Sequence, residues 1–119
     1  MSDSIIEEVL KELEKLGLRV RRRVTVKGIA GFNYCFDVVI ENSKSGKKVA
    51  LMYIDEVDAR HVLPILACRV DTDMRHIVIT HQANTDALTL LNEAKVDVLI
   101  TSSKYDARKL ANKIIELMR

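Results

Sequence analysis

One side chain stands out in this sequence as a candidate for chemistry. It is the carboxylate of Asp37, which lies inside an apolar, strand-like run, YCFDVVIE (residues 34–41). Burying a carboxylate among apolar side chains is costly unless it has partners or a task. Alternation along a strand predicts two faces, one carrying Phe36, Val38 and Ile40 and the other carrying Cys35, Asp37, Val39 and Glu41. Asp37 is therefore expected on a largely apolar face.

The histidines and cysteines do not combine into a known motif. His61, His76 and His81 have neither the HxxxH nor the HExxH spacing of a zinc site. His76 and His81 flank a strand-like run and are expected at its solvated ends. Cys35 and Cys68 lie far apart in apolar surroundings, which predicts buried free thiols in a reducing cytosol.

Three strand-like runs follow one another around Asp37. They cover residues 19–26, 34–41 and 47–55, and turn-forming segments rich in glycine, asparagine and serine separate them. Their β-branched content and short connections predict an antiparallel meander of adjacent strands. The third run is apolar on both faces and ends at Asp55, as expected of a central strand.

Four helices are expected around these strands, and each has a recognisable start. The predicted caps, in chain order, are Ser4 in a capping box with Glu7, then Asp55 or Glu56, then Asn84, and finally Ser102 or Ser103. Pro64 lies inside the second helix, which runs from Val57 to about Cys68, and is expected to kink or divide it. The runs at 76–80 and 96–100 are two further strands, each reached through a helix, which predicts parallel pairing there.

The resulting order is helix, three strands, helix, strand, helix, strand, helix. It predicts an α/β fold with a single mixed β-sheet of about five strands flanked by helices. Residues 1–119, with 48% hydrophobic content, fit one domain. No run approaches the roughly 18 apolar residues of a membrane span, and the charged N-terminus does not resemble a signal peptide. A cytoplasmic protein is expected, and its 30% charged content hints at a thermophile.

Positive charge is concentrated locally, because the net charge is only +2. The basic side chains of the meander are Arg19, Arg21, Arg22, Arg23, Lys27, Lys44, Lys47 and Lys48. One interpretation is an edge strand whose charges discourage pairing with other chains. The alternative is a ridge that contacts nucleic-acid phosphates. Along the first strand, alternation predicts one face with Val20, Arg22, Val24 and Val26 and an opposite face with Arg21 and Arg23.

The element order, with an aspartate in the second strand, resembles the restriction-endonuclease-like superfamily of PD-(D/E)xK nucleases. The segment HIVITHQANTDALTLLNEAKVDVLITSSKYDARKL (residues 76–110) is similar to the closing segment of Mrr-type restriction enzymes and their archaeal relatives. The resemblance covers nearly the whole chain in element order, and at the level of residues it covers this segment and Asp37. It implies the fold of these nucleases and a site for Mg²⁺-dependent cleavage of DNA.

In that family an acid one strand over, followed two residues later by a lysine, joins the second-strand aspartate. Mg²⁺ requires hard oxygen ligands, and the lysine positions the attacking water or offsets developing charge. Asp37 matches the first position. The alignment places Met52 and Ile54 at the partner positions, and a shift of one residue places Leu51 and Tyr53 there. Neither pair restores an acid or a lysine, so the resemblance implies a degenerate site without a resident metal or cofactor, in which Asp37 is a relic.

A rearranged centre would need its other groups from elsewhere in the chain. The candidate acids are Glu7, Glu8, Asp55 and Glu56, and the candidate cations are Lys27 and Arg60. With such partners Asp37 would hold Mg²⁺ or Mn²⁺ in an active endonuclease.

Three functions of different classes follow, and we rank them in this order. The first is a catalytically inactive nuclease-fold protein that binds DNA or RNA, or is a structural subunit of a larger complex. The second is a homodimeric protein-interaction module without a nucleic-acid role, whose interface is the apolar strand at 50–54 or the last helix. The third is an active Mg²⁺-dependent endonuclease centred on Asp37.

Overall fold

The computed structural model describes residues 2–101 and 106–118, with side chains from Ile5 onward. Its elements are α1 (Ser2–Lys15), β1 (Arg19–Lys27), β2 (Asn33–Glu41), β3 (Lys48–Val57), α2 (Ala59–Asp71), β4 (Arg75–Ala83), α3 (Thr85–Glu93), β5 (Asp97–Ile100) and α4 (Ala107–Met118). This is the predicted order of elements. Within these residues no helix has the length and apolar character needed to cross a membrane.

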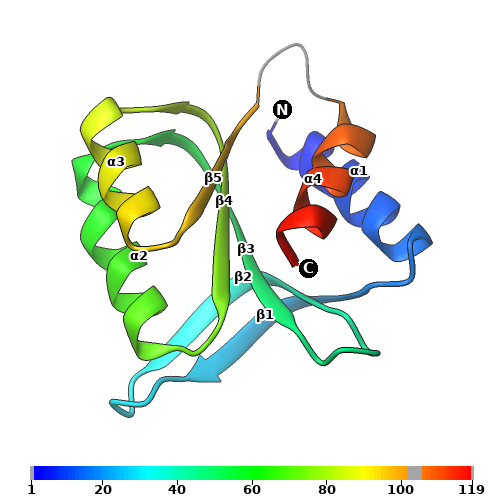
Figure 1. Ribbon diagram of the computed structural model, residues 1–119, viewed down its shortest axis with the longest axis horizontal. Helices are drawn as coiled ribbons and strands as arrows, with labels where there is room; N and C mark the ends of the chain where they lie inside the picture. The colour runs from blue at the N-terminus through cyan, green and yellow to red at the C-terminus, as the bar shows by residue number, and fades with distance from the viewer. Residues whose placement is uncertain (1, 102–105, 119) are drawn as a thin grey trace.

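The strands form one five-stranded sheet in which β1 to β5 lie side by side in sequence order. The pairs β1–β2 and β2–β3 are antiparallel, whereas β3–β4 and β4–β5 are parallel. Helices α1 and α4 pack on one face of the sheet, and α2 and α3 pack on the other (Figure 1). The predicted α/β fold with a mixed sheet is confirmed, with β1 at an edge and β3 in the centre.

Alternation along β3 divides its side chains between two hydrophobic cores. Val49, Leu51 and Tyr53 pack against the core under α1 and α4. Met52 and Ile54 pack against the core under α2 and α3. Because a strand has a side-chain period of two, pairing with β2 and β4 on either side fixes this division along the strand.

The alternation reverses in the middle of β1 and of β2, which the sequence-based prediction missed. Val20 packs on the α1 and α4 side of the sheet, whereas Val24 packs on the opposite side. In β2, Val38 packs on the α1 and α4 side, whereas Phe36 packs on the opposite side. Two predictions are therefore wrong. The first placed Val20 on one face with Val24 and Val26, and the second placed Phe36 on one face with Val38 and Ile40.

The reversal has its origin at Arg23 and Asp37. The ladder pairs Arg22 with Val38 and Val24 with Phe36, and the residues between these pairs are Arg23 and Asp37. Arg23 has a φ of 53°, in the left-handed region that non-glycine residues rarely adopt. An irregularity of this kind lets two consecutive side chains of one strand point to the same side, as in a β-bulge.

Some predicted helix starts also differ from the structure. Helix α1 begins at Ser2, so Ser4 lies within the helix and is not its cap. Strand β3 continues beyond the predicted end because its pairing with β4 extends to Val57. Asp58 is consequently the cap of α2, in place of Asp55 or Glu56.

The other predictions for the helices have different outcomes. Asn84 caps α3 as predicted, since its side chain accepts hydrogen bonds from two backbone amides of the first turn. Helix α2 is continuous across Pro64, so the predicted division is wrong. The predicted caps Ser102 and Ser103 lie outside the described residues.

A single carboxylate, Asp71, anchors the β1–β2 hairpin to the end of α2. Its two oxygens accept hydrogen bonds from the Ala30 amide and the Tyr34 hydroxyl, each at 2.7 Å. Its backbone carbonyl accepts a third from the Ile29 amide at 2.9 Å. A Cβ atom on Gly28 would lie 2.1 Å from a carboxylate oxygen of Asp71, so this approach requires glycine.

Gly28→Ala should therefore lower the free energy of unfolding by about 2 kcal/mol, because the added methyl group overlaps the anchoring carboxylate. In an Asp71→Ala background the same substitution should cost less, since the nearest clashing atoms are gone. Urea denaturation of the wild type, the two single variants and the double variant measures the cost of Gly28→Ala in each background. Equal costs of Gly28→Ala in the two backgrounds would contradict this anchor.

Candidate functional site

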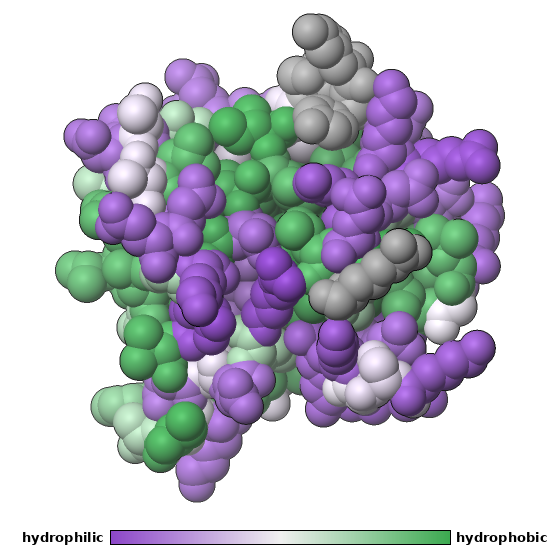
Figure 2. Space-filling model, viewed as in Figure 1, coloured by the Kyte–Doolittle hydropathy of each residue, from purple (hydrophilic) through white to green (hydrophobic). Residues whose placement is uncertain are grey.

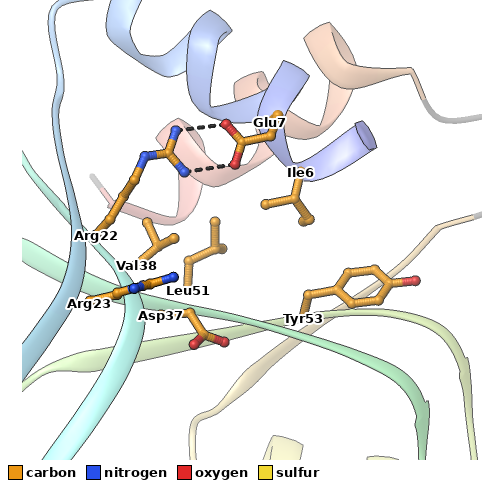
Figure 3. A pocket seen from close by; sticks show the side chains of 8 residues that line it. All are labelled: Ile6, Glu7, Arg22, Arg23, Asp37, Val38, Leu51 and Tyr53. Atoms are coloured by element: carbon orange, nitrogen blue, oxygen red, sulfur yellow. Dashed lines mark hydrogen bonds and ion pairs between the residues drawn. The ribbon is translucent and has the colours of Figure 1, made fainter. Parts of the chain in front are cut away.

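A cavity of about 480 Å³ opens between α1 and the middle of the sheet, where β1 and β2 reverse their alternation. Its lining residues are Ile6, Glu7, Arg22, Arg23, Asp37, Val38, Leu51 and Tyr53 (Figure 3). Two consecutive residues of β1 and two of β2 line it, which a regular strand does not allow. The backbone irregularity thus brings both Arg23 and Asp37 to the cavity.

Glu7 is held by an arginine. Both of its carboxylate oxygens accept hydrogen bonds from the Arg22 guanidinium, at 2.7 and 2.8 Å. This bidentate contact raises the pKa of Arg22 above its ordinary value. The two side chains are about half exposed, so the pair contributes little to stability. Its main effect is to occupy the carboxylate that α1 brings to the cavity.

Asp37 is exposed, and its carboxylate points away from the Glu7–Arg22 pair (Figure 3). The neighbouring strand β3 presents Leu51 and Tyr53 to the same cavity. The Tyr53 hydroxyl donates a hydrogen bond to Asp55 at 2.8 Å. The side chains beside Asp37 are therefore an alkyl group and a phenol.

The first alignment of the partner positions, with Met52 and Ile54, does not agree with this geometry. Both side chains pack on the opposite face of the sheet, under α2 and α3. The alignment shifted by one residue, with Leu51 and Tyr53, matches the side chains that line the cavity with Asp37. Both faces of β3 are apolar, so the sequence offered no pattern to choose between the two.

The other candidate acids lie elsewhere. Asp55 and Glu56 line a separate cavity at the carboxyl ends of β3 and β4, together with Arg60, His61 and His81. Glu8 is exposed on α1, and it is not among the residues that line the cavity at Asp37. In the described part of the chain, no three His, Cys, Asp or Glu side chains are grouped so that they could hold a metal ion.

The donor set beside Asp37 does not fit Mg²⁺. A magnesium site needs an octahedral set of hard oxygen ligands, to which proteins usually contribute carboxylates. Here one carboxylate faces Leu51 and Tyr53, and Glu7 is neutralised by Arg22. The arrangement offers a cation, an acid, a phenol and an apolar wall, which are groups suited to binding a ligand.

The histidines have separate structural roles. His61 accepts a hydrogen bond from the Asp58 amide in the capping box of α2. The Arg60 guanidinium holds the pKa of Asp58 at about 2. His81 contacts the Thr101 hydroxyl at 3.2 Å.

Two expectations for buried and exposed side chains are wrong. His76 is fully buried and packs edge-on against Phe36, although it was expected at a solvated strand end. Burial lowers its pKa below the ordinary histidine value. Cys35 is exposed, although a buried thiol was expected.

The basic side chains of the meander differ in how they are neutralised. Arg22 pairs with Glu7, and Arg21 lies 3.7 Å from Glu41. The others are exposed and form no side-chain hydrogen bond or ion pair with the residues that the structure describes: Arg19, Arg23, Lys27, Lys44, Lys47 and Lys48. Of these, Arg23 lines the cavity with Asp37.

Comparison with known proteins relates the chain to an archaeal sequence. A protein from Archaeoglobus fulgidus, described only as an uncharacterized protein, is 32% identical over 92 residues, which are 77% of this chain and 71% of that protein. The chain belongs to the family of this archaeal protein. No family model matches the sequence.

Comparison with solved structures shows a nuclease-like fold. A repair endonuclease from Pyrococcus abyssi superposes with a TM-score of 0.60 at 15% identity, over 86% of this chain and 47% of that one. EndoMS bound to double-stranded DNA superposes with a TM-score of 0.54 at 15% identity, over 87% of this chain and 46% of that one. EndoMS without DNA superposes with a TM-score of 0.52 at 16% identity, over 88% of this chain and 48% of that one. The chain thus spans a little under half the length of these proteins.

Proposed function

We propose that this chain is a nuclease-fold protein that binds nucleic acid and does not hydrolyse it. The fold supports a link to a repair endonuclease from Pyrococcus abyssi and to EndoMS, which was solved with double-stranded DNA. Fold alone does not determine activity, so the proposal depends on the residues at the site. We infer that the site is a degenerate form of the PD-(D/E)xK centre.

The observation that carries the proposal is the pair Leu51 and Tyr53 beside Asp37. Metal-assisted hydrolysis of a phosphodiester requires ligands that hold the ion and a group that orients the attacking water. An isobutyl side chain does neither. The Tyr53 hydroxyl is a neutral oxygen that is already hydrogen-bonded to Asp55, so it is a poor substitute for a carboxylate or a lysine.

The unpaired basic side chains support the binding half of the proposal. Arg23 at the cavity and Lys47 and Lys48 at the start of β3 are exposed and have no acidic partner among the described residues. A cation that is not neutralised within the protein is available to a phosphate group. Such contacts do not read the base sequence, so we expect affinity without sequence preference.

The first test is cleavage. Single-stranded, double-stranded and branched DNA should remain intact with Mg²⁺ or Mn²⁺ at high protein concentration, because Asp37 has no second metal ligand among the residues that the structure describes. Gel analysis of labelled substrates measures this result. Cleavage that disappears in Asp37→Ala, but persists in the matched control Glu93→Ala on α3, would show an active centre and contradict the proposal.

The second test is binding, measured by fluorescence anisotropy over a range of salt concentrations. The logarithm of the affinity should fall linearly with the logarithm of the salt concentration. The double variant Lys47→Ala, Lys48→Ala should reduce the slope by about 2 for duplex DNA, since each lost phosphate contact contributes about 0.9. Arg23→Ala should reduce it by about 1.

The control for this test is Arg108→Ala, Lys113→Ala, which removes the same charge from α4. It should leave the slope unchanged. If the wild-type protein shows no affinity at low salt, or if both double variants lower the slope equally, the proposed contact surface is wrong.

A further inference from the structure

Another cavity, of about 500 Å³, lies where β4 and β5 begin, beside the last turn of α2 and the turn that follows α3. Its lining residues are Arg69, Arg75, Asn92, Lys95 and Asp97, which we call the β4–β5 basic pocket. All of these side chains are polar or charged, and cations outnumber acids among them. Figure 2 shows hydrophilic side chains gathered near the middle of the view, over the start of β5.

One of the cations in this pocket is already neutralised. The Arg75 guanidinium donates a hydrogen bond to the Asp97 carboxylate at 2.7 Å and another to the Leu117 carbonyl. Arg75 therefore offsets the negative charge of Asp97. The charges that remain are those of Arg69 and Lys95.

Arg69 is a partly buried cation without an acceptor. It lies in the last turn of α2 and forms no hydrogen bond or ion pair with the residues that the structure describes. Its Nε atom is fully buried and still has no partner. Buried donors without an acceptor are costly and rare in folded proteins. An anion in the adjoining cavity would balance this charge and give the guanidinium its acceptors.

Lys95 occupies a position that usually selects glycine. It follows α3 with a φ of 64°, in the left-handed region, where a lysine is strained and a glycine is not. Its side chain is exposed and has no acidic partner in the described part of the chain. At this position lysine brings to the pocket a positive charge that glycine lacks.

We propose that the β4–β5 basic pocket binds a phosphate group. Two unpaired cations suit a divalent anion, and a guanidinium can donate to two phosphate oxygens at once. The side-chain amide of Asn92 adds a further donor. The lining residues include no aromatic ring, so they offer no surface on which a base could stack. The pocket therefore recognises the phosphate rather than the group attached to it.

The phosphate has two possible sources, a free ion and a nucleic acid. Arg75 also lines a neighbouring cavity with Lys47 and Lys48, the two lysines proposed above to contact DNA. A strand held by these lysines thus has a phosphate-binding pocket beside it. The inference goes beyond the proposed function and does not rest on it, because the binding of free phosphate requires neither DNA nor Asp37.

The test is a titration of the full chain with inorganic phosphate at constant pH and ionic strength, followed by backbone amide signals in NMR. The signals of residues 92–97 should shift and saturate, with a dissociation constant of about 1 mM, as expected for a few charge-assisted hydrogen bonds. Arg69→Met keeps a long side chain and removes the charge, so it should weaken binding at least about tenfold. The matched control Arg108→Met removes an arginine from α4 and should bind phosphate as the wild type does.

Two further variants separate binding from folding. Lys95→Gly should weaken phosphate binding about fivefold without lowering the melting temperature, because glycine suits the left-handed backbone. Asp97→Asn should strengthen binding about threefold, since it removes the negative charge that opposes the anion. Damage to the fold would not produce such a gain in affinity.

The salt dependence of DNA binding identifies the source of the phosphate. Arg69→Met should reduce the slope by about 1 if the pocket holds a nucleic-acid phosphate, and should leave the slope unchanged if it holds a free ion. Both results support the pocket, and a protein that binds phosphate but not DNA would contradict only the proposed function. Shifts that do not saturate would overturn the pocket, as would an equal loss of phosphate affinity in Arg69→Met and Arg108→Met.

Discussion

The side-chain alternation of β3 determines what lies beside Asp37. This strand is central and pairs with β2 on one side and with β4 on the other. A slip of one residue would move every side chain of β3 to the opposite core, so its register is strongly fixed. Leu51 and Tyr53 are consequently held on the side of the Asp37 cavity, and Met52 and Ile54 are held away from it.

The reversal in β1 and β2 completes the cavity from the other side. It brings Arg23 and Asp37 to the cavity, next to Arg22 and Val38. The left-handed backbone at Arg23 costs of order 1 kcal/mol, which the surrounding ladder must offset. Strain of this kind is often found at functional sites, and here it places a cation and an acid at one opening. The Glu7–Arg22 pair removes the second acid from that set.

The sequence predicted the order of elements and the mixed sheet because each segment carries a strong local signal. The caps, the turn residues and the β-branched runs all agree with one architecture. The reversal could not be predicted, since no glycine marks the left-handed position and Arg23 occupies it. The sequence also could not show which side of β3 faces Asp37. This strand is apolar on both faces, so it lacks the alternation of apolar and polar residues that would distinguish them.

The outward face of α2 shows a different limit of sequence-based prediction. Leu63 and Val70 are exposed on the outer side of α2, and hydrophobicity alone does not distinguish such side chains from the buried ones of the same helix. Only the packing of Val62 and Ile65 against the sheet shows which side of the helix is already occupied.

The most direct test of the account is a titration with Mn²⁺, followed by paramagnetic broadening of backbone amide signals. A carboxylate without a second ligand should bind the ion weakly. The signals of Asp37, Leu51 and Tyr53 should therefore broaden no more than that of Glu93, an exposed acid on α3. Selective broadening around Asp37 at low Mn²⁺, abolished in Asp37→Asn, would contradict the account.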